Sequence, residues 1–531
     1  MISSAIENED KLLSLALSLG ARTVEGWSRA ELDRVRHLDP LRDGALVQRA
    51  RNEMRAGGDP LGEMFCSLRS PAVRRFRGAT YTPKPIVESM LSWAACGHVP
   101  DRVVDPGAGS GRFLVSAGRK FPAAALVGVE VDPVASILLR ANLAATGLAA
   151  RSTVLVDDYR NVSLPKIPGR SLFTGNPPYV RHHLIEKKWK NWLAETAKAR
   201  NLRASQLAGL HVHFILKTVE EASVGDYGSF ITSAEWLDVN YGSLVRELVL
   251  EGLGGQAVHL IEPKLAPFPD AATTGAITCF EVGKRPAAVS FSVARKIGDL
   301  KDLRGGQPIS RDLLLTERRW TVFTRKRQPL PEGCVELGEF CRVHRGQVTG
   351  GNRIWIAGPH ATGLPRRALF PAVTKARELI EAGTILFDGS GLRKVIDLPP
   401  ELDLFHGAER RAIERFLRWA RRQDAHRGYI ARTRRAWWSV GLREPAPILA
   451  TYMARRPPVF VRNLARARNI NIAHGIYPQI PLNEKMLNQL VEHLSANATV
   501  SRGRTYAGGL TKFEPREMER VPVPSPELLA V

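Results

Sequence analysis

"VVDPGAGSGRFL", residues 103–114, places three glycines between a short apolar run and a helical pattern. Gly107, Gly109 and Gly111 permit a tight turn and let backbone N–H groups approach a ligand closely. The spacing is GxGxG, so the third glycine of a dinucleotide-binding loop is absent from its usual position. The stretch therefore predicts a strand, a turn and a helix, with a small-molecule site at the turn.

Acidic residues close the next two apolar runs. "LVGVEVDP", residues 126–133, carries Glu130 about 20 residues beyond the loop, where an acid in a nucleotide-binding fold hydrogen-bonds ribose hydroxyls. Asp157 and Asp158 end the run that begins at Ser152. Because the carboxyl ends of parallel strands meet at one edge of a sheet, the loop and these acids predict a nucleoside pocket there. Asp158 taken by itself also fits a helix N-cap.

Short apolar runs alternate with helical patterns from about residue 80 to 285. This alternation predicts an α/β domain with a mostly parallel sheet covered by helices. The runs expected to form strands are "RVVDP", "ALVGVEVD", "STVLVDD", "SLFTGNPP", "GSFITS" and "GAITCFEV".

"TGNPPYV", residues 174–180, closes the fourth of these runs. Prolines cannot donate to a sheet ladder or continue a helix, so Pro177 and Pro178 hold the turn rigid. The side-chain oxygen of Asn176 and the carbonyl of Pro177 can both accept hydrogen bonds from the exocyclic amino group of a purine. These bonds free the nitrogen lone pair from the ring and direct it at an electrophilic methyl group, while Tyr179 stacks on the base. The segment therefore indicates methyl transfer to a base amino group.

The charge balance points to a polyanionic partner. The 531 residues include 76 Lys and Arg against 53 Asp and Glu, a formal net charge of +23. Such a field attracts nucleic acid, the commonest polyanion, and an acidic membrane surface is the alternative. The sequence has no run of 18 apolar residues that could span a bilayer, so we expect no membrane segment.

The N-terminus and the cysteines predict a reduced, cytoplasmic protein. "MISSAIENEDKLLSLALSLG" has acids before a short apolar run and lacks the basic region of a signal peptide. The five cysteines are scattered without a CxxC pair, which argues against a disulfide framework and a structural zinc site.

Four motifs in a fixed order carry a family resemblance. "YTPKPIVESML" (81–91), the glycine loop, "LVGVEVDP" and "GNPPYV" together resemble the gamma class of adenine-specific DNA methyltransferases, in particular the TaqI-like modification methylases of type II restriction-modification systems. The similarity covers about residues 80–285. It continues more loosely into residues 338–356 and 503–524, which resemble parts of that family's target-recognition domain.

The resemblance implies S-adenosylmethionine as the cofactor. Carried over by motif, Thr82 would contact the methionine carboxylate, and Asp105 with the glycine loop would line the methionine end. Glu130 would hold the ribose, and Asp158 would hold the cofactor adenine. No metal is expected.

The resemblance also implies a site for a flipped target adenine. Asn176, Pro177 and Tyr179 would hold this base. In "TTGAITCFEVGK" (273–284), Phe280 falls where the family places a second aromatic ring against the base, although a strand phenylalanine also fits an ordinary core position.

The expected fold is a class I, Rossmann-like methyltransferase domain followed by a mixed α+β target-recognition domain. We expect a helical N-terminal extension at 1–75, the catalytic domain at 76–290, a linker at 291–330 and the DNA target-recognition domain at 331–531. Residues 401–470 hold 16 Arg, no Lys and 6 acids, interleaved with Trp and Tyr. This composition suits phosphate and base contacts better than the alternative, a solvated helix face.

Other functions remain open at this level. The same Asn-Pro-Pro-Tyr tetrapeptide occurs in enzymes that methylate guanine in RNA or a glutamine side chain in a protein, and these resemble the chain only in the catalytic domain. A non-catalytic DNA-binding specificity subunit could retain the fold, but intact Asn176 and Tyr179 speak against decay. We see no paired acids with a lysine that would indicate a fused nuclease.

The sequence thus predicts a monomeric enzyme that methylates adenine in a short duplex recognition sequence. Its biological partner would be a cognate restriction endonuclease, against which the methylation protects DNA.

Overall fold

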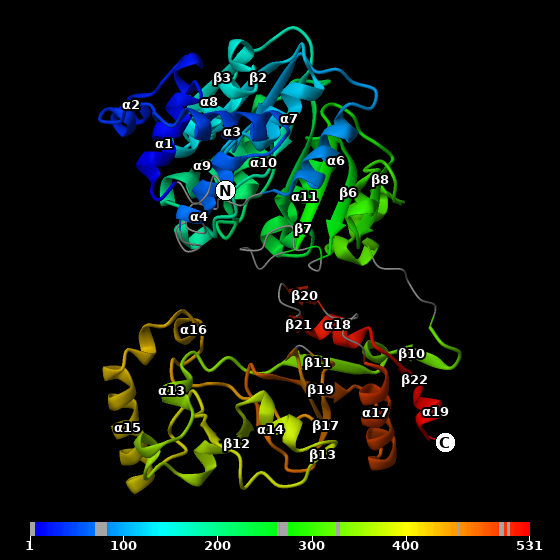
Figure 1. Ribbon diagram of the computed structural model, residues 1–531. Helices are drawn as coiled ribbons and strands as arrows, with labels where there is room; N and C mark the ends of the chain where they lie inside the picture. Colours follow the sequence, from blue (N-terminus) through cyan, green and yellow to red (C-terminus); the bar gives the residue numbers. More distant parts are fainter. Residues whose placement is uncertain are drawn as a thin grey trace. The chain divides into compact units, whose positions relative to one another are not determined.

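The chain folds into two compact units, Met1–Lys326 (unit 1) and Arg327–Val531 (unit 2). The computed structural model describes residues 6–69, 82–262, 265, 274–324, 330–454, 456–498, 504–506 and 510–530. Among these residues, no helix combines the length and the apolar character that a membrane crossing requires. Figure 1 shows both units, and each is considered by itself.

Unit 1 is built on a sheet that has nine strands within the described residues. The strands are β1 (Arg102–Asp105), β2 (Ala125–Glu130), β3 (Ser152–Val156), β4 (Ser171–Gly175), β5 (Tyr227–Ser233), β6 (Gly255–Ile261), β7 (Gly275–Glu281), β8 (Ala288–Ala294) and β9 (Gln307–Ser310). Their order is β3-β2-β1-β4-β5-β7-β6-β8-β9. Strands β3 to β5 in this order are parallel, and β7 runs antiparallel between β5 and β6. The predicted mostly parallel sheet is confirmed.

Helices cover both faces of this sheet (Figure 1). They are α6 (Lys84–Ala94), α7 (Arg112–Lys120), α8 (Pro133–Ala145), α9 (Lys187–Ala199), α10 (Leu210–Glu221) and α11 (Ser243–Glu251). Successive strand residues point to opposite faces, so Val103 packs in the core with α6 and α7, whereas Val104 packs with α10 and α11. Because both faces are buried, the central strands read as nearly continuous apolar runs. This is the expected α/β, Rossmann-like methyltransferase architecture.

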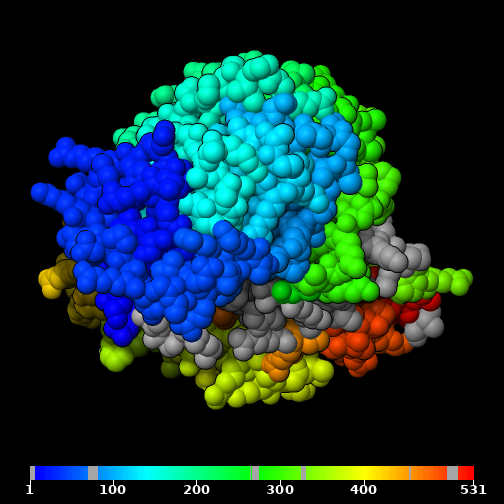
Figure 2. Space-filling view, turned by 45° about the horizontal axis from the view of Figure 1, so that its top comes forward, coloured from blue at the N-terminus to red at the C-terminus, as the bar shows by residue number. Residues whose placement is uncertain are grey.

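The N-terminal extension is helical, as expected, and shares a core with the sheet domain. Its helices are α1 (Glu9–Ser18), α2 (Arg29–Val35), α3 (Gly44–Arg55) and α4 (Pro60–Leu68). Their apolar faces pack against α8, and Figure 2 shows these blue helices lying against the cyan part of the chain. Arg140 of α8 is fully buried, forms an ion pair with buried Glu31 at 2.7 Å, and donates to the carbonyl oxygens of Val24, Glu25 and Gly26. The extension is therefore an integral layer of unit 1.

The predicted linker at 291–330 differs from the structure. Strands β8 and β9 extend the sheet through this range, followed by α12 (Arg311–Thr316), and unit 1 ends at Lys326. Phe291 and Trp320 are buried against each other in the unit 1 core. The exposed charged residues Arg295, Lys296 and Arg304 lie in the connection between β8 and β9.

Unit 2 combines several small sheets with helices packed on them, the expected mixed α+β class. A five-stranded sheet, counted within the described residues, has the order β11-β19-β15-β17-β13. Its strands are β11 (Cys341–Arg345), β13 (Ile385–Leu386), β15 (Ile448–Thr451), β17 (Phe460–Asn463) and β19 (Ala473–Pro478). The other strands are β10 (Cys334–Glu336), β12 (Leu369–Val373), β14 (Lys394–Ile396), β16 (Met453–Ala454), β18 (Arg468–Asn469), β20 (Arg504–Tyr506), β21 (Leu510–Lys512) and β22 (Pro522–Pro524). The helices are α13 (Asn352–Trp355), α14 (Ala376–Glu381), α15 (Gly407–Arg422), α16 (Tyr429–Arg432), α17 (Glu484–Asn497), α18 (Pro515–Glu519) and α19 (Pro526–Ala530).

Candidate active site

The glycine loop joins β1 to α7 as the sequence predicts. Gly109 and Gly111 adopt left-handed backbone with φ of 54° and 96°, a region that suits glycine. A Cβ on Gly111 would also overlap the side chain of Leu139, so only glycine fits there. The backbone N–H of Gly109 donates to Glu130 Oε2 at 2.8 Å. The loop is thereby fixed to the end of β2.

Glu130 lies beside the loop, as expected for the second strand end. Its other oxygen, Oε1, accepts a hydrogen bond from the backbone N–H of Asp132 at 2.9 Å. Burial raises the pKa of this carboxyl above its ordinary value and outweighs the backbone hydrogen bonds, which lower it. Ribose binding by Glu130 stays a prediction. In the structure, the same side chain holds the glycine loop through the backbone N–H of Gly109.

Asp105 closes β1 in a confined position between the loop and β4. Its side chain is buried, and Oδ1 accepts a hydrogen bond from the backbone N–H of Gly107 at 3.2 Å. A Cβ at Gly175 would overlap the Asp105 carboxylate, so the glycine that precedes Asn176 permits this close approach. Gly175 is thus a further residue that shapes the site, beyond those predicted from the sequence. Its place immediately before the Asn-Pro-Pro-Tyr segment was the one available signal.

Burial raises the pKa of Asp105 to about 8, against the weaker opposing effect of the hydrogen bond from Gly107. The folded protein therefore keeps a proton that the unfolded chain releases near pH 4. As a result, the contribution of Asp105 to stability is greatest below pH 4 and falls as the pH rises through about 8.

We expect Asp105→Asn to gain stability relative to the wild type over this pH window. The amide of Asn does not titrate, so the variant does not lose stability as the pH rises. The difference in melting temperature between the variant and the wild type should therefore be small near pH 4 and grow up to about pH 8. Melting curves of both proteins without cofactor, at a series of pH values, measure this. A constant difference across the series would contradict the raised pKa.

The Asn-Pro-Pro-Tyr segment lies directly beside the glycine loop. A Cβ at Gly107 would lie 3.6 Å from Pro178 Cδ and 3.9 Å from the carbonyl oxygen of Asn176. The side-chain nitrogen of Asn176 donates to Thr82 Oγ1 at 3.0 Å, although the two residues are 94 positions apart. The structure thus brings together three predicted elements: the Thr82 segment, the loop and Asn176.

Tyr179 is half-buried, and its hydroxyl donates to the carbonyl oxygen of Ile231 in β5 at 3.5 Å. Burial raises the pKa of this phenol well above its ordinary value, so the ring stays neutral at physiological pH. A neutral ring on a rigid turn suits the stacking role that the sequence predicts.

Asp158 closes β3 in an Asx turn, and no helix follows that it could cap. Its oxygens accept from the backbone N–H, Nε and Nη2 of Arg160, at 3.0, 2.8 and 2.6 Å. Burial alone would raise the pKa of Asp158, but the hydrogen bonds and charge of Arg160 lower it, so the carboxylate is ionised. Arg160 also stacks on Trp189 at 3.9 Å, which ties this strand end to α9.

The predicted place of Phe280 beside the target base is wrong. Phe280 is 0% exposed and packs on Phe230 in the interior, with ring centroids 5.6 Å apart. Strand β7 is antiparallel to β5 and pairs Phe280 with Gly228, near the start of β5, whereas β4 ends at Gly175 opposite Phe230. The antiparallel direction carries Phe280 away from the edge where the site lies. The strand that holds Phe280 could be predicted from the sequence, but its antiparallel direction could not.

Comparisons with known proteins show the family of the chain. Residues 172–257 match the family model of the Eco57I restriction-modification methylase, a range that begins with β4 and includes the Asn-Pro-Pro-Tyr segment. Residues 312–530 match the C-terminal domain of the type II methyltransferase M.Eco57I. The type II methyltransferase M.XamI of Xanthomonas campestris pv. amaranthicola is 50% identical over 534 residues and covers 99% of both chains. The chain belongs to the type II methyltransferases.

A more distant type II methyltransferase, M.AccI of Acinetobacter calcoaceticus, is 21% identical and covers 83% of this chain and 84% of its own. Among solved structures, the type IIG restriction endonuclease BpuSI has a TM-score of 0.50 at 14% identity, and covers 97% of this chain and 70% of its own. That similarity concerns the fold, and it extends across both units of this type II methyltransferase.

Type II methyltransferases use S-adenosylmethionine, and the residues at the strand ends suit it. Gly107 leaves the space of a side chain open between the loop, Pro178 and Phe214. The carboxyl groups of Glu130 and Asp158, at the ends of β2 and β3, can accept hydrogen bonds from the amino and hydroxyl groups of a nucleoside. Of the eleven site residues predicted from the sequence, Phe280 is the one that the structure places elsewhere.

Proposed function

We propose that this type II DNA methyltransferase transfers the methyl group to the exocyclic amino group of adenine in a short duplex sequence. The observation that carries the proposal is the Asn-Pro-Pro-Tyr segment at the end of β4, beside the glycine loop, with the Asn176 carboxamide oriented by Thr82. A fixed carboxamide and a rigid carbonyl are the acceptor pair that an aromatic amino group requires.

In the proposed mechanism, Asn176 and Pro177 act on the nitrogen of the base. The side-chain oxygen of Asn176 and the carbonyl oxygen of Pro177 accept hydrogen bonds from its two N–H groups, which localises the lone pair on nitrogen. Tyr179 stacks on the flipped base and offsets part of the lost base stacking. When bound, S-adenosylmethionine would supply the electrophilic methyl group and leave as S-adenosylhomocysteine, and the methylated nitrogen would release one of its protons. The bond from Asn176 to Thr82 keeps the acceptor in place before substrate arrives, so little reorganisation is needed in the transition state.

The cofactor roles follow from the strand ends. Thr82 and Asp105 would bind the methionine end with Gly107, Gly109 and Gly111. Glu130 would hold the ribose hydroxyls, and Asp158 would accept from the cofactor adenine. Glu130 and Asp158 each already accept hydrogen bonds from this chain, which fixes their orientation for such contacts.

Transfer of labelled methyl groups from S-adenosylmethionine to four substrates tests the substrate class. The substrates are duplex DNA, single-stranded DNA, transfer RNA and a peptide with an exposed glutamine. We expect label in duplex DNA that contains the recognition sequence. Label in RNA or peptide alone would favour the other Asn-Pro-Pro-Tyr enzymes, and DNA binding without label would favour a specificity subunit.

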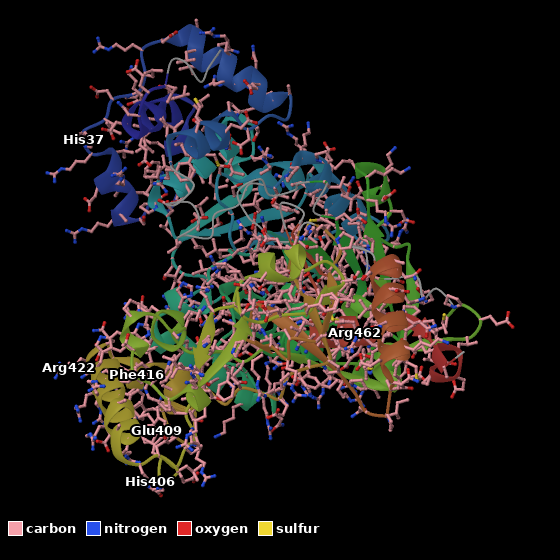
Figure 3. The ribbon with its side chains drawn as sticks, turned by 90° about the horizontal axis from the view of Figure 1, so that it is seen from below. His37, His406, Glu409, Phe416, Arg422 and Arg462 are labelled. Atoms are coloured by element: carbon pink, nitrogen blue, oxygen red, sulfur yellow. The ribbon has the colours of Figure 1, made fainter. Side chains whose placement is uncertain are left out.

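A stripe of arginines on α15 supports a DNA-contacting role for unit 2. The face formed by Ala412, Ile413, Phe416 and Ala420 is buried in the core of this unit. The opposite face carries Arg411, Arg415, Arg418 and Arg422, all exposed and spaced along one side of the helix. Figure 3 labels Phe416 and Arg422 on this helix. Within the described residues, none of these four arginines forms an ion pair, so the stripe suits phosphate groups.

Salt dependence tests this surface. Each phosphate contact that a basic side chain makes contributes about −0.9 to the slope of log affinity against log salt. Replacing the four arginines by glutamine should reduce that slope by about 3 to 4. A charge-matched control replaces exposed Arg29, Arg36, Arg42 and Arg49 of unit 1 by glutamine. Equal loss of slope in both variants would show a general charge effect and remove α15 from the interface.

We further propose that the enzyme is a cytoplasmic monomer and that a cognate restriction endonuclease cleaves the same sequence when it is unmethylated. The restriction-modification family supports this setting.

A further inference from the structure

Asp59 connects the N-terminal extension to the glycine loop. It is 6% exposed and caps α4, with Oδ1 accepting from the backbone N–H of Gly62 at 2.9 Å. Its other oxygen, Oδ2, accepts from the hydroxyl of Ser110 at 2.7 Å. Ser110 lies between Gly109 and Gly111 in the loop itself.

Asn142 of α8 completes a closed hydrogen-bond triangle. Its side-chain nitrogen donates to Asp59 Oδ1 at 3.0 Å and to the carbonyl oxygen of Ser110 at 2.8 Å. Ser110 is therefore held at both its hydroxyl and its carbonyl. The two flanking glycines would otherwise allow the loop many backbone conformations, so this anchor restricts the conformation of the loop.

Arg112 extends the connection toward the reacting end of the site. Its Nε lies 3.8 Å from Asp59 Oδ2, and its Nη1 donates to the carbonyl oxygen of Thr82 at 2.8 Å. The hydroxyl of Thr82 in turn accepts from the side chain of Asn176. Asp59 thus contacts the glycine loop directly and approaches the Thr82 segment through Arg112. The side chains involved are buried or half-buried.

We propose that Asp59 is a positioning residue for the cofactor loop, so that the N-terminal extension forms part of the S-adenosylmethionine site. The inference rests on the proposed function in one respect, namely that the glycine loop holds the cofactor. Asp59 touches neither substrate nor cofactor. It preorganises Ser110 and its neighbours, and its loss lowers cofactor affinity more than the rate of methyl transfer.

The test compares Asp59→Ala with Asp43→Ala in the full-length enzyme. Asp43 caps α3 in the same extension by accepting from the backbone N–H of Leu46 at 2.9 Å, so both variants lose one helix cap. Affinity for S-adenosylmethionine is measured by titration calorimetry, and kcat and KM are measured with saturating DNA. We expect Asp59→Ala to weaken cofactor binding and raise its KM by about tenfold, with kcat within about twofold. Asp43→Ala should leave both values near those of the wild type.

Ser110→Ala removes the hydrogen bond between Ser110 and Asp59 from the other side and leaves the α4 cap intact. We expect it to weaken cofactor binding, and the double variant Asp59→Ala/Ser110→Ala should lose no more than Asp59→Ala alone, because Asp59→Ala already removes the hydrogen bond of the Ser110 hydroxyl. Additive losses, or unchanged cofactor affinity in Asp59→Ala, would overturn the inference.

The titration separates this inference from the proposed function. It measures cofactor binding without DNA, so its outcome does not depend on which base is methylated. If the wild type binds S-adenosylmethionine and Gly111→Ala binds equally well, the loop is not the cofactor site and the proposed site assignment fails. If Gly111→Ala loses binding and Asp59→Ala does not, the positioning role of Asp59 alone fails.

Discussion

Replacing Asn176 by Ala is expected to slow methyl transfer by about 10²–10³-fold in single-turnover experiments. The variant removes one of the two acceptors that localise the lone pair, and it removes the donor to Thr82. Affinity for duplex DNA should change little, because the arginines of α15 in unit 2 are unaffected. Rapid-quench measurement of methyl transfer, beside a filter-binding titration, gives both quantities.

Asn52→Ala is the matched control, because Asn52 is exposed on α3 in the N-terminal extension of the same unit. Its rate should equal that of the wild type. A normal single-turnover rate for Asn176→Ala would remove Asn176 from the catalytic site, and an equal loss in both variants would point to an effect on folding.

Phe280→Ala is expected to reduce the free energy of unfolding by about 3–5 kcal/mol. The ring is fully buried against Phe230, and its edge reaches the backbone at Gly228, so truncation leaves a cavity in the centre of the sheet. Phe280→Trp should also destabilise, by about 1–3 kcal/mol, because the larger ring overpacks this space. Thermal and denaturant unfolding measure both changes.

Phe387→Ala serves as the control, because Phe387 is 71% exposed and should tolerate truncation with little change in stability. A stacking role for Phe280 predicts the reverse result for Phe280→Ala, namely a normal melting temperature with methyl transfer slowed tenfold or more. That outcome would contradict the core position seen in the structure.

The strands that bound the site could be predicted because each reads as an apolar run closed by a glycine, an acid or a proline. Strand β6 was missed because Gln256 and His259 interrupt its pattern. His259 is buried there only because Ser292 and the carbonyl of Leu303 satisfy its two ring nitrogens, which is a tertiary arrangement. Strands β8 and β9 were missed because β8 is only partly buried and β9, at the edge of the sheet, is mostly exposed, so their polar residues resemble those of a connection.

Some site residues could likewise be predicted from the sequence, and others could not. Glu130 and Asp105 could be placed from the sequence because the carboxyl ends of parallel strands meet at one edge, whatever the details of packing. The contact between Asp59 and Ser110 could not be predicted from the sequence. The two residues are 51 positions apart, and their contact depends on how the N-terminal extension packs on α8. Phe280 was misplaced because the strand pattern gives no direction.

The position of the transferred methyl group tests the central claim most directly. Duplex DNA methylated by the purified enzyme with labelled S-adenosylmethionine is digested to nucleosides, which are separated and identified by mass spectrometry. We expect all label in N6-methyl-2′-deoxyadenosine, and label that accumulates about 10²–10³-fold more slowly when Asn176→Ala replaces the wild type. Label in a methylated cytosine or guanine nucleoside would contradict the proposed chemistry of the Asn-Pro-Pro-Tyr site.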